Sequence, residues 1–234
     1  MGALILNIDT ALDTASVSLA EDGKLLLFSK NKSRNDHASW LHKAIEELVK
    51  PMPAGFHGLQ AVGVNDGPGS YTGLRIGLSA AKGLCYALQI PLITANSLEV
   101  MALGSILDLK VNEADWDLAD WLLCPMIDAR RMEVFTAVYD ADLNEIMKPM
   151  ALVLDERTID RLAGRRKILF LGNGSVKFQQ ICHDPRAMFK TFSLNPVALA
   201  SLTYRNFVGN NFAGLIYTEP LYLKEFFTKP PSGL

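Results

Sequence analysis

The sequence predicts an α/β fold in which two halves share the element order strand, strand, strand, helix, strand, helix. Short apolar or alternating runs, typical of strands, come between longer runs in which apolar residues recur every three or four positions, as in helices. These runs follow the same order in both halves of the chain. In each half the first strand also ends in an aspartate, Asp9 or Asp128.

The first half gives a clear signal for each of its elements. An alternating strand pattern followed by Asp22-Gly23 predicts a hairpin. We expect Asp36 to cap the N-terminus of the next helix, and Pro51 prevents its extension. The predicted strands lie at residues 4–8, 15–19, 25–29, 61–65 and 91–94, and the predicted helices at residues 37–50 and 72–89.

The second half repeats this order. Its predicted strands lie at residues 122–128, 133–139, 145–153 and 167–173, and its predicted helices at residues 156–163 and 175–182. This duplicated β-β-β-α-β-α order resembles the ribonuclease-H-like fold of the actin, sugar kinase and Hsp70 superfamily, in which two domains face each other across a nucleotide cleft. We therefore expect an N-terminal domain at residues 1–98 and a C-terminal domain at residues 99–234, whose last segment can pack back on the first.

Composition excludes several classes of protein. The 234 residues, 49% hydrophobic, can bury a large core, and a net charge of -2 creates no overall field that attracts nucleic acid. Cys85, Cys124 and Cys182 lack the paired spacing of a zinc site and indicate buried thiols in a reducing compartment. No apolar run approaches the ~18 residues of a membrane helix, and the first residues lack the basic start of a signal peptide. We expect a cytoplasmic protein with no membrane association.

The segment from Asn65 to Gly77 is the most informative, because it places four glycines and a proline between a strand and a helix. Its glycine spacing matches neither the Rossmann fingerprint nor the phosphate-binding P-loop, and Ser70 is not placed as in a nucleophile elbow. We expect Ser70 and Thr72 to cap the following helix rather than to attack a substrate.

The two turns after the strand-end aspartates lack the glycines that allow backbone N–H groups to approach phosphates. Their loss argues against a working kinase or ATPase. Gly172-Asn173-Gly174 is either the base-side turn of this degenerate cleft or a simple turn between a strand and a helix. The candidate residues of the degenerate nucleotide cleft are Asp9, Thr10, Asp128, Arg130, Gly172 and Gly174.

The sequence contains no pattern typical of a metal site or of a catalytic nucleophile. His37 and His42 are five residues apart, which separates them by about 140° on a helix, so they cannot share a metal ion as an i, i+4 pair does. We interpret both as partly exposed helix residues. We expect no catalytic residue and no metal ligand in this chain.

The helix after the glycine loop is apolar around nearly its whole circumference, with Arg75 and Lys82 as its charged residues. Such a helix must be covered on more than one side. Gly73, Gly77 and Ala81, at i, i+4 and i+8, form a smooth strip on which another helix could pack closely. The covering element is either another subunit or the second domain of the same chain.

Four motifs resemble the TsaB (YeaZ) family: residues 6–10, 67–77, 127–130 and 219–223. The resemblance implies a bacterial, non-catalytic paralogue of the TsaD transferase, needed to make N6-threonylcarbamoyladenosine in tRNAs that read A-starting codons. It also implies that TsaD carries the metal and the transfer chemistry, that a TsaE-type ATPase joins the full complex, and that tRNA is reached through the complex. The family signature in this chain comprises Gly67, Pro68, Gly69, Ser70, Thr72, Gly73 and Arg75.

The resemblance further implies that two helices bind TsaD, or a second copy of the chain when TsaD is absent. TsaD-type proteins hold iron or zinc through histidines at i, i+4, and the spacing of His37 and His42 departs from that pattern. We expect ATP and metal on the partner subunits and none on this chain alone. The predicted interface comprises Trp40, Leu41, Ile45, Leu74, Gly77, Leu78, Ala81, Leu84 and Leu88.

Other functions stay open at this stage. They are an independent ATP-dependent phosphotransferase or glycoprotease-like peptidase of the same fold, and a self-associating structural protein. A basic stripe at Arg157, Arg161 and Arg165 is either a contact for tRNA phosphate or a solvated helix face. The acidic segment at residues 108–121 has no predicted function.

Overall fold

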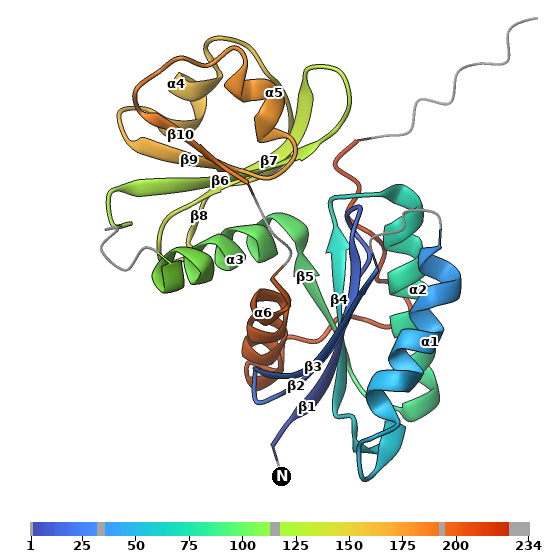
Figure 1. The fold of residues 1–234 in the computed structure, drawn as a ribbon. Coiled ribbons are helices and arrows are strands. Elements are labelled where there is room, and N and C mark those ends of the chain that lie inside the picture. The colour runs from blue at the N-terminus through green and yellow to red at the C-terminus, as the bar shows by residue number, and fades with distance from the viewer. Residues whose placement is uncertain (1, 32–35, 113–117, 192–194, 225–234) are drawn as a thin grey trace, which may run out of the picture.

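The computed structural model describes residues 2–31, 36–112, 118–191 and 195–224. It contains two five-stranded sheets, each with its own helices (Figure 1). The first half comprises β1 (Leu4–Asp9), β2 (Ala15–Glu21), β3 (Lys24–Asn31), α1 (His37–Val49), η1 (Gly55–Gly58), β4 (Ala61–Gly67), α2 (Tyr71–Leu88), β5 (Leu92–Asn96) and α3 (Ser97–Asn112). The second comprises β6 (Trp121–Asp128), β7 (Glu133–Tyr139), β8 (Glu145–Val153), α4 (Thr158–Ala163), β9 (Lys167–Leu171), α5 (Ser175–Gln179), β10 (Ala187–Lys190) and α6 (Pro196–Val208).

Both sheets have the same topology. The order is β3-β2-β1-β4-β5 in the first and, read from the equivalent edge, β8-β7-β6-β9-β10 in the second. In each, the first three strands pair antiparallel and the last two join in parallel. The predicted duplication and the ribonuclease-H-like fold class are therefore confirmed.

The sequence patterns did not predict α3, β10 and α6. α3 contacts strands of both sheets and also α6, so it is covered on several sides and has no polar face to reveal a helical period. β10 has only four residues. α6 does carry a helix start signal in the sequence, because Pro196 follows Asn195, whose Oδ1 accepts a hydrogen bond from Val197 N at 3.0 Å.

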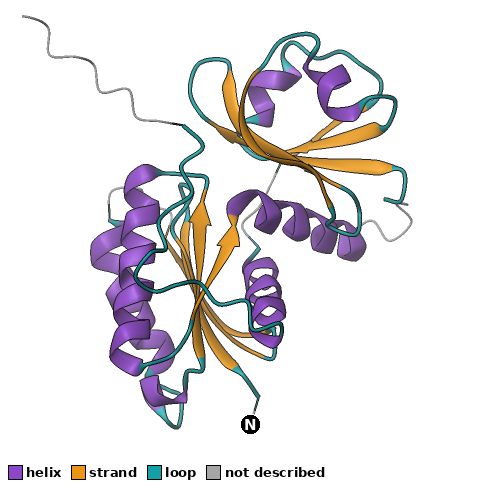
Figure 2. Ribbon diagram, turned by 180° about the vertical axis from the view of Figure 1, so that it is seen from behind, coloured by secondary structure: helices purple, strands orange, loops and turns teal. Residues whose placement is uncertain are grey.

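The end of the chain returns to the first sheet. α1 and α2 cover one face of that sheet and α6 covers the other (Figures 1 and 2). Thr203 Oγ1 of α6 donates to the buried Asn7 Oδ1 at 2.6 Å. Ala213 N donates to Leu92 O at 2.8 Å, on the outer edge of the sheet. Residues 196–223 thus pack mainly with the N-terminal half, whereas Lys224 pairs with Glu133 of the second.

α2 contacts α1 and strands of the first sheet, whereas α3 is the helix between the two sheets. The alternative that α2 is buried between the two domains is therefore wrong. None of the described helices is long and apolar enough to cross a membrane. Of the acidic segment, residues 113–117 lie outside the described residues.

Candidate functional site

The glycine loop contacts the first hairpin turn through backbone atoms. Ser70 N donates to Ala11 O at 2.7 Å, and Thr10 Oγ1 donates to Gly73 O at 2.7 Å. A Cβ added to Gly73 would lie 2.1 Å from Thr10 O, and one on Gly69 would lie 2.3 Å from Ala11 O. These glycines therefore allow two segments of the same chain to approach each other, rather than a ligand to approach the backbone.

The small-residue strip predicted on α2 faces inward. A Cβ on Gly77 would lie 2.3 Å from Thr10 Oγ1 and 3.4 Å from Ile8 Cγ2, and Ala81 is fully buried in the core. The strip thus packs against β1 and its turn. The prediction that it receives another helix is wrong, because periodicity alone does not tell which side of a helix faces its own sheet.

Each of the two turns uses its aspartate in the same way. Asp9 Oδ1 accepts a hydrogen bond from Ala11 N at 3.0 Å, and Asp128 Oδ1 accepts one from Arg130 N at 3.0 Å. A phosphate-binding turn needs such N–H groups for its ligand. In this chain both N–H groups are already bonded to the aspartate of their own turn, so they are not available to a phosphate.

The surroundings of the two aspartates differ. Asp9 is 3% exposed, and burial raises its pKa, although hydrogen bonds from Ala11 and Asn65 partly oppose the shift. Asp128 is exposed and pairs with Lys177 Nζ at 2.5 Å. Partial burial raises the pKa of Asp128, but the bonds from Lys177 and Arg130 outweigh it, so the pKa lies below its usual value.

Lys177 closes the second turn. Its ammonium group donates to Arg131 O at 2.8 Å and to Glu133 O at 2.5 Å, in addition to Asp128. The turn therefore directs carbonyl oxygens toward a lysine of its own half. Arg130 has a φ of 70°, a left-handed conformation that glycine adopts more easily.

Gly172 and Gly174 form a tight structural turn. Gly172 has a φ of 91°, and a Cβ there would lie 2.5 Å from Met126 O. A Cβ on Gly174 would lie 2.9 Å from the carbonyl carbon of Ile127. Asn173 Oδ1 accepts from Asp128 N at 2.9 Å. These contacts account for both glycines by packing against β6, which favours the simple-turn interpretation.

The described residues contain no group of three histidine, cysteine or acidic side chains that could hold a metal ion. His42 is exposed, but His37 is buried, contrary to the interpretation that both are partly exposed. Burial raises the pKa of the Cys85 thiol to about 11 and that of Cys124 to about 12. Both thiols are therefore protonated near neutral pH and unreactive.

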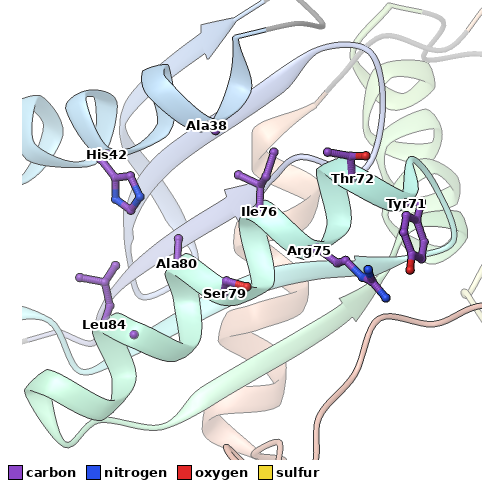
Figure 3. A pocket seen from close by; sticks show the side chains of 10 residues that line it. Ala38, His42, Tyr71, Thr72, Arg75, Ile76, Ser79, Ala80 and Leu84 are labelled. Atoms are coloured by element: carbon purple, nitrogen blue, oxygen red, sulfur yellow. The ribbon is translucent and has the colours of Figure 1, made fainter.

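An open groove of about 700 Å³ lies between the outer faces of α1 and α2 (Figure 3). Its lining is mainly small and apolar, and it contains one charged side chain, Arg75, and no acidic one. We call it the α1–α2 groove. It is lined by Ala38, His42, Tyr71, Thr72, Arg75, Ile76, Ser79, Ala80, Gly83 and Leu84.

Most of the predicted interface residues are not available at this surface. Six of them are buried in the first domain, where they pack on its own sheet. Because they already contact the core, they cannot form the contact surface for another protein, and their assignment to the interface is wrong. They are Leu41, Ile45, Leu74, Gly77, Leu78 and Ala81. The partly exposed members are Trp40, Leu84 and Leu88, of which Leu84 lines the groove.

The sequence did contain a signal for the exposed face, which we missed. Ser79 and Gly83, at i and i+4, form a second row of small residues opposite the buried one, and Ala80 lies beside them. A Cβ on Gly83 would meet no atom within 4 Å. Glycine costs about 1 kcal/mol relative to alanine inside a helix, and no contact among the described residues explains it here.

The C-terminal motif lies beside the groove. Leu221 N donates to Asp66 O at 2.8 Å, next to the glycine loop. Tyr222 Oη accepts from Arg75 Nε at 3.0 Å. Farther along α2, Lys82 Nζ donates to Thr218 O at 3.0 Å. The segment from Ala213 to Lys224 therefore follows α2 along its length, and we call it the C-terminal strap.

The basic stripe is partly neutralised within the chain. Arg161 pairs with Asp155 at 2.9 Å, and the neighbouring Arg186 pairs with Asp160 and Asp184. Since these carboxylates offset the positive charge, the structure favours a solvated helix face over a contact for tRNA.

Comparisons with known proteins agree with this architecture. A family model described as "TsaD: tRNA N6-adenosine threonylcarbamoyltransferase" matches residues 31–206. The tRNA threonylcarbamoyladenosine biosynthesis protein TsaB of Bacillus subtilis is 30% identical over 183 residues, covering 77% of this chain and 75% of that protein. TsaB of Escherichia coli is 33% identical over 142 residues, covering 61% of this chain and 57% of that protein.

Among solved structures, YeaZ from Pseudomonas aeruginosa has the same fold. The TM-score is 0.78 at 22% identity, and the match covers 94% of this chain and 100% of that one. The family model covers most of the chain, and the Bacillus subtilis relative is matched over three quarters of its length. The chain therefore belongs to the family that this model describes and, within it, to the TsaB (YeaZ) members.

Proposed function

We propose that this chain is a non-catalytic subunit of the bacterial assembly that makes N6-threonylcarbamoyladenosine in tRNA, and that its α1–α2 groove binds a TsaD-type transferase. The transferase supplies the metal and the transfer chemistry, and a TsaE-type ATPase joins the full complex and uses ATP. The chain pairs with a second copy of itself when alone and reaches tRNA through its partners. This function places it in the cytoplasm, where it encounters tRNA.

The observation that carries the proposal is the state of the two hairpin turns. In each, a backbone N–H that could bind a phosphate is bonded to the turn's own aspartate, Asp9 or Asp128. Lys177 and the glycine loop then hold the turns from the other side. A phosphotransferase of this fold needs glycine-rich turns that approach polyphosphate. The alternative of an independent ATP-using enzyme therefore has little support.

The α1–α2 groove suits a helix of another protein. Gly83, Ser79 and Ala80 leave its floor without large side chains, so a second backbone can come as close as the 8–10 Å typical of packed helices. Ile76 and Leu84 add apolar surface that loses contact with water on binding. An exposed groove of this kind is typical of helix-in-groove recognition.

Co-expression with the TsaD-type transferase of the same organism tests the partner. We expect the two chains to elute together in size-exclusion chromatography. Gly83→Arg should abolish the complex, because a long charged side chain would fill the floor of the groove. Val208→Arg, at an exposed position of α6 on the other face of the sheet, is the matched control and should leave the complex intact. Co-elution of the Gly83→Arg variant would rule out the groove.

Nucleotide titration tests the non-catalytic role. Isothermal titration of the isolated chain with ATP and Mg²⁺ should show no binding in the micromolar range. The transfer reaction on tRNA should require the TsaD-type chain in every mixture. Micromolar ATP binding with turnover by this chain alone would favour the phosphotransferase alternative instead.

A further inference from the structure

Arg75 stands out among the charged residues of the first domain. It lies in the first turns of α2, at one end of the α1–α2 groove (Figure 3). Its guanidinium carbon is 3.8 Å from the centre of the Tyr71 ring, and its Nε donates to Tyr222 Oη at 3.0 Å. The rings of Tyr71 and Tyr222 are 5.3 Å apart. Two aromatic side chains thus fix the plane of an exposed guanidinium group.

The held guanidinium has no carboxylate partner among the described residues. Other surface arginines differ in this respect: Arg161 pairs with Asp155 at 2.9 Å, and Arg205 pairs with Glu99 at 2.6 Å. For Arg75, the one bond within the described part of the chain uses Nε, so both terminal nitrogens keep their hydrogens for another acceptor. An arginine that is positioned but not paired is a ready anion receptor.

The geometry of the Arg75 guanidinium indicates which anion it can bind. The edge formed by Nη1 and Nη2 matches the two oxygens of a carboxylate, and such paired bonds are both directional and strong. Because Tyr71 and Tyr222 already restrict the side chain, binding loses little further conformational entropy. A helix packed in the groove would also exclude water, which strengthens the attraction between the charges.

We infer that Arg75 binds a glutamate or aspartate side chain on the partner helix that occupies the α1–α2 groove, and that Tyr222 of the C-terminal strap positions it. This inference rests on the proposed function. The groove lining supports it by charge complementarity, because Arg75 is its one charged side chain and no acidic residue among those that line it competes. It also gives a role to the C-terminal motif at residues 219–223.

Isothermal titration of the full chain with the TsaD-type transferase measures the contribution. We expect Arg75→Ala to weaken binding about 30-fold or more, as for other buried charge pairs that lose one member. Arg75→Lys should restore only part of the affinity, since an ammonium lacks the planar fork. Tyr222→Phe should weaken binding about fivefold through the loss of the hydrogen bond that positions Arg75. Lys24→Ala, in the β2–β3 hairpin, is the control and should bind normally.

Charge exchange identifies the acceptor. Arg75→Glu should abolish binding, and one arginine replacing one carboxylate on the transferase's contact helix should restore it. If no such arginine on the transferase restores binding, the inference is overturned. So would normal affinity of Arg75→Ala, or an effect of that variant seen only with added ATP, which would assign Arg75 to a phosphate. If the unaltered chain fails to bind the transferase at all, the proposed function itself fails. Thermal unfolding of each variant excludes loss of the fold as the cause.

Discussion

Asp9 and Asp128 occupy equivalent positions in the two halves, yet their environments are opposite. Each ends the first strand of its sheet and accepts a hydrogen bond from the backbone two residues later. Asp9 is buried, whereas Asp128 is exposed and bound to Lys177. Equivalent turns are thus closed by close packing in one half and by charge pairing in the other.

The difference has physical consequences that can be measured. Close packing tolerates no added atoms and makes buried carboxyl groups harder to ionise. An exposed ion pair tolerates changes in volume but responds to salt and to the ionisation of its acid. Mutations, pH and salt should therefore affect the two turns differently.

The largest expected effect is that of Gly73→Ala. The added Cβ would lie 2.1 Å from Thr10 O, a backbone atom that cannot move without shifting the whole turn. We expect a loss of about 3 kcal/mol in the free energy of unfolding, measured by urea denaturation. Gly83→Ala, on the open face of the same helix, is the matched control and should stabilise the protein by about 1 kcal/mol. Equal effects of the two substitutions would contradict the packing difference.

The second effect concerns Asp66, at the end of β4 in the first half. Burial raises its pKa to about 6, against a weaker opposing hydrogen bond from Thr94. The unfolded chain loses this proton near pH 4, but the folded chain keeps it until about pH 6, so stability should fall as pH rises between these values. The shift of about two pH units corresponds to about 3 kcal/mol as an upper value.

Asp66→Asn removes this ionisation. We expect the variant to match the wild type near pH 4 and to be more stable by about 2 kcal/mol at pH 7. Chemical denaturation at a series of pH values measures both curves. If the stability of the wild type falls no more steeply than that of the variant between pH 4 and pH 6, burial does not raise the pKa of Asp66.

The third effect tests the second turn. Lys177→Met leaves the carbonyl oxygens of Arg131 and Glu133 without their lysine donor and removes the ion pair with Asp128. We expect a loss of about 1–2 kcal/mol in the free energy of unfolding. The loss should shrink at high salt, because screening already weakens the pair in the wild type. Lys148→Met, at an exposed position of β8, should change stability little. A loss that salt leaves unchanged would argue against charge pairing.

Local patterns predicted most strands and helices of both halves, because alternating or helical periodicity is visible wherever one face of an element is buried and the other is exposed to solvent. They failed for α3, which is covered by both sheets and α6 and so shows no period. They allowed the last segment to pack back on the first domain but did not identify α6, whose position depends on contacts such as Thr203 with Asn7, 196 residues apart.

The site shows the same limit. The spacing of the loop glycines indicates a close approach of two backbones, but their partners, Thr10 and Ala11, lie about 60 residues earlier and are not visible in that spacing. Periodicity predicted that α2 is covered on more than one side, yet it could not distinguish the row at Gly77, which is buried, from the row at Gly83, which is exposed. Only the position of β1 decides that the first row is internal and the second open.

The smallest expected effect on the free energy of unfolding is that of Asp128→Asn, and its sign should be opposite to that of Asp66→Asn. The pKa of Asp128 is lowered, so its ionised form adds stability above about pH 4 that is lost as pH falls through the folded-state pKa. The Asp128 side chain is 47% exposed, and the contribution should stay under about 1 kcal/mol. The variant should therefore be slightly less stable at pH 7 and equal near pH 2, as measured by denaturation across that range. Because Asp66→Asn should change stability in the opposite direction at pH 7, effects of equal sign would mean that the two halves do not differ in how their surroundings act on these carboxyl groups.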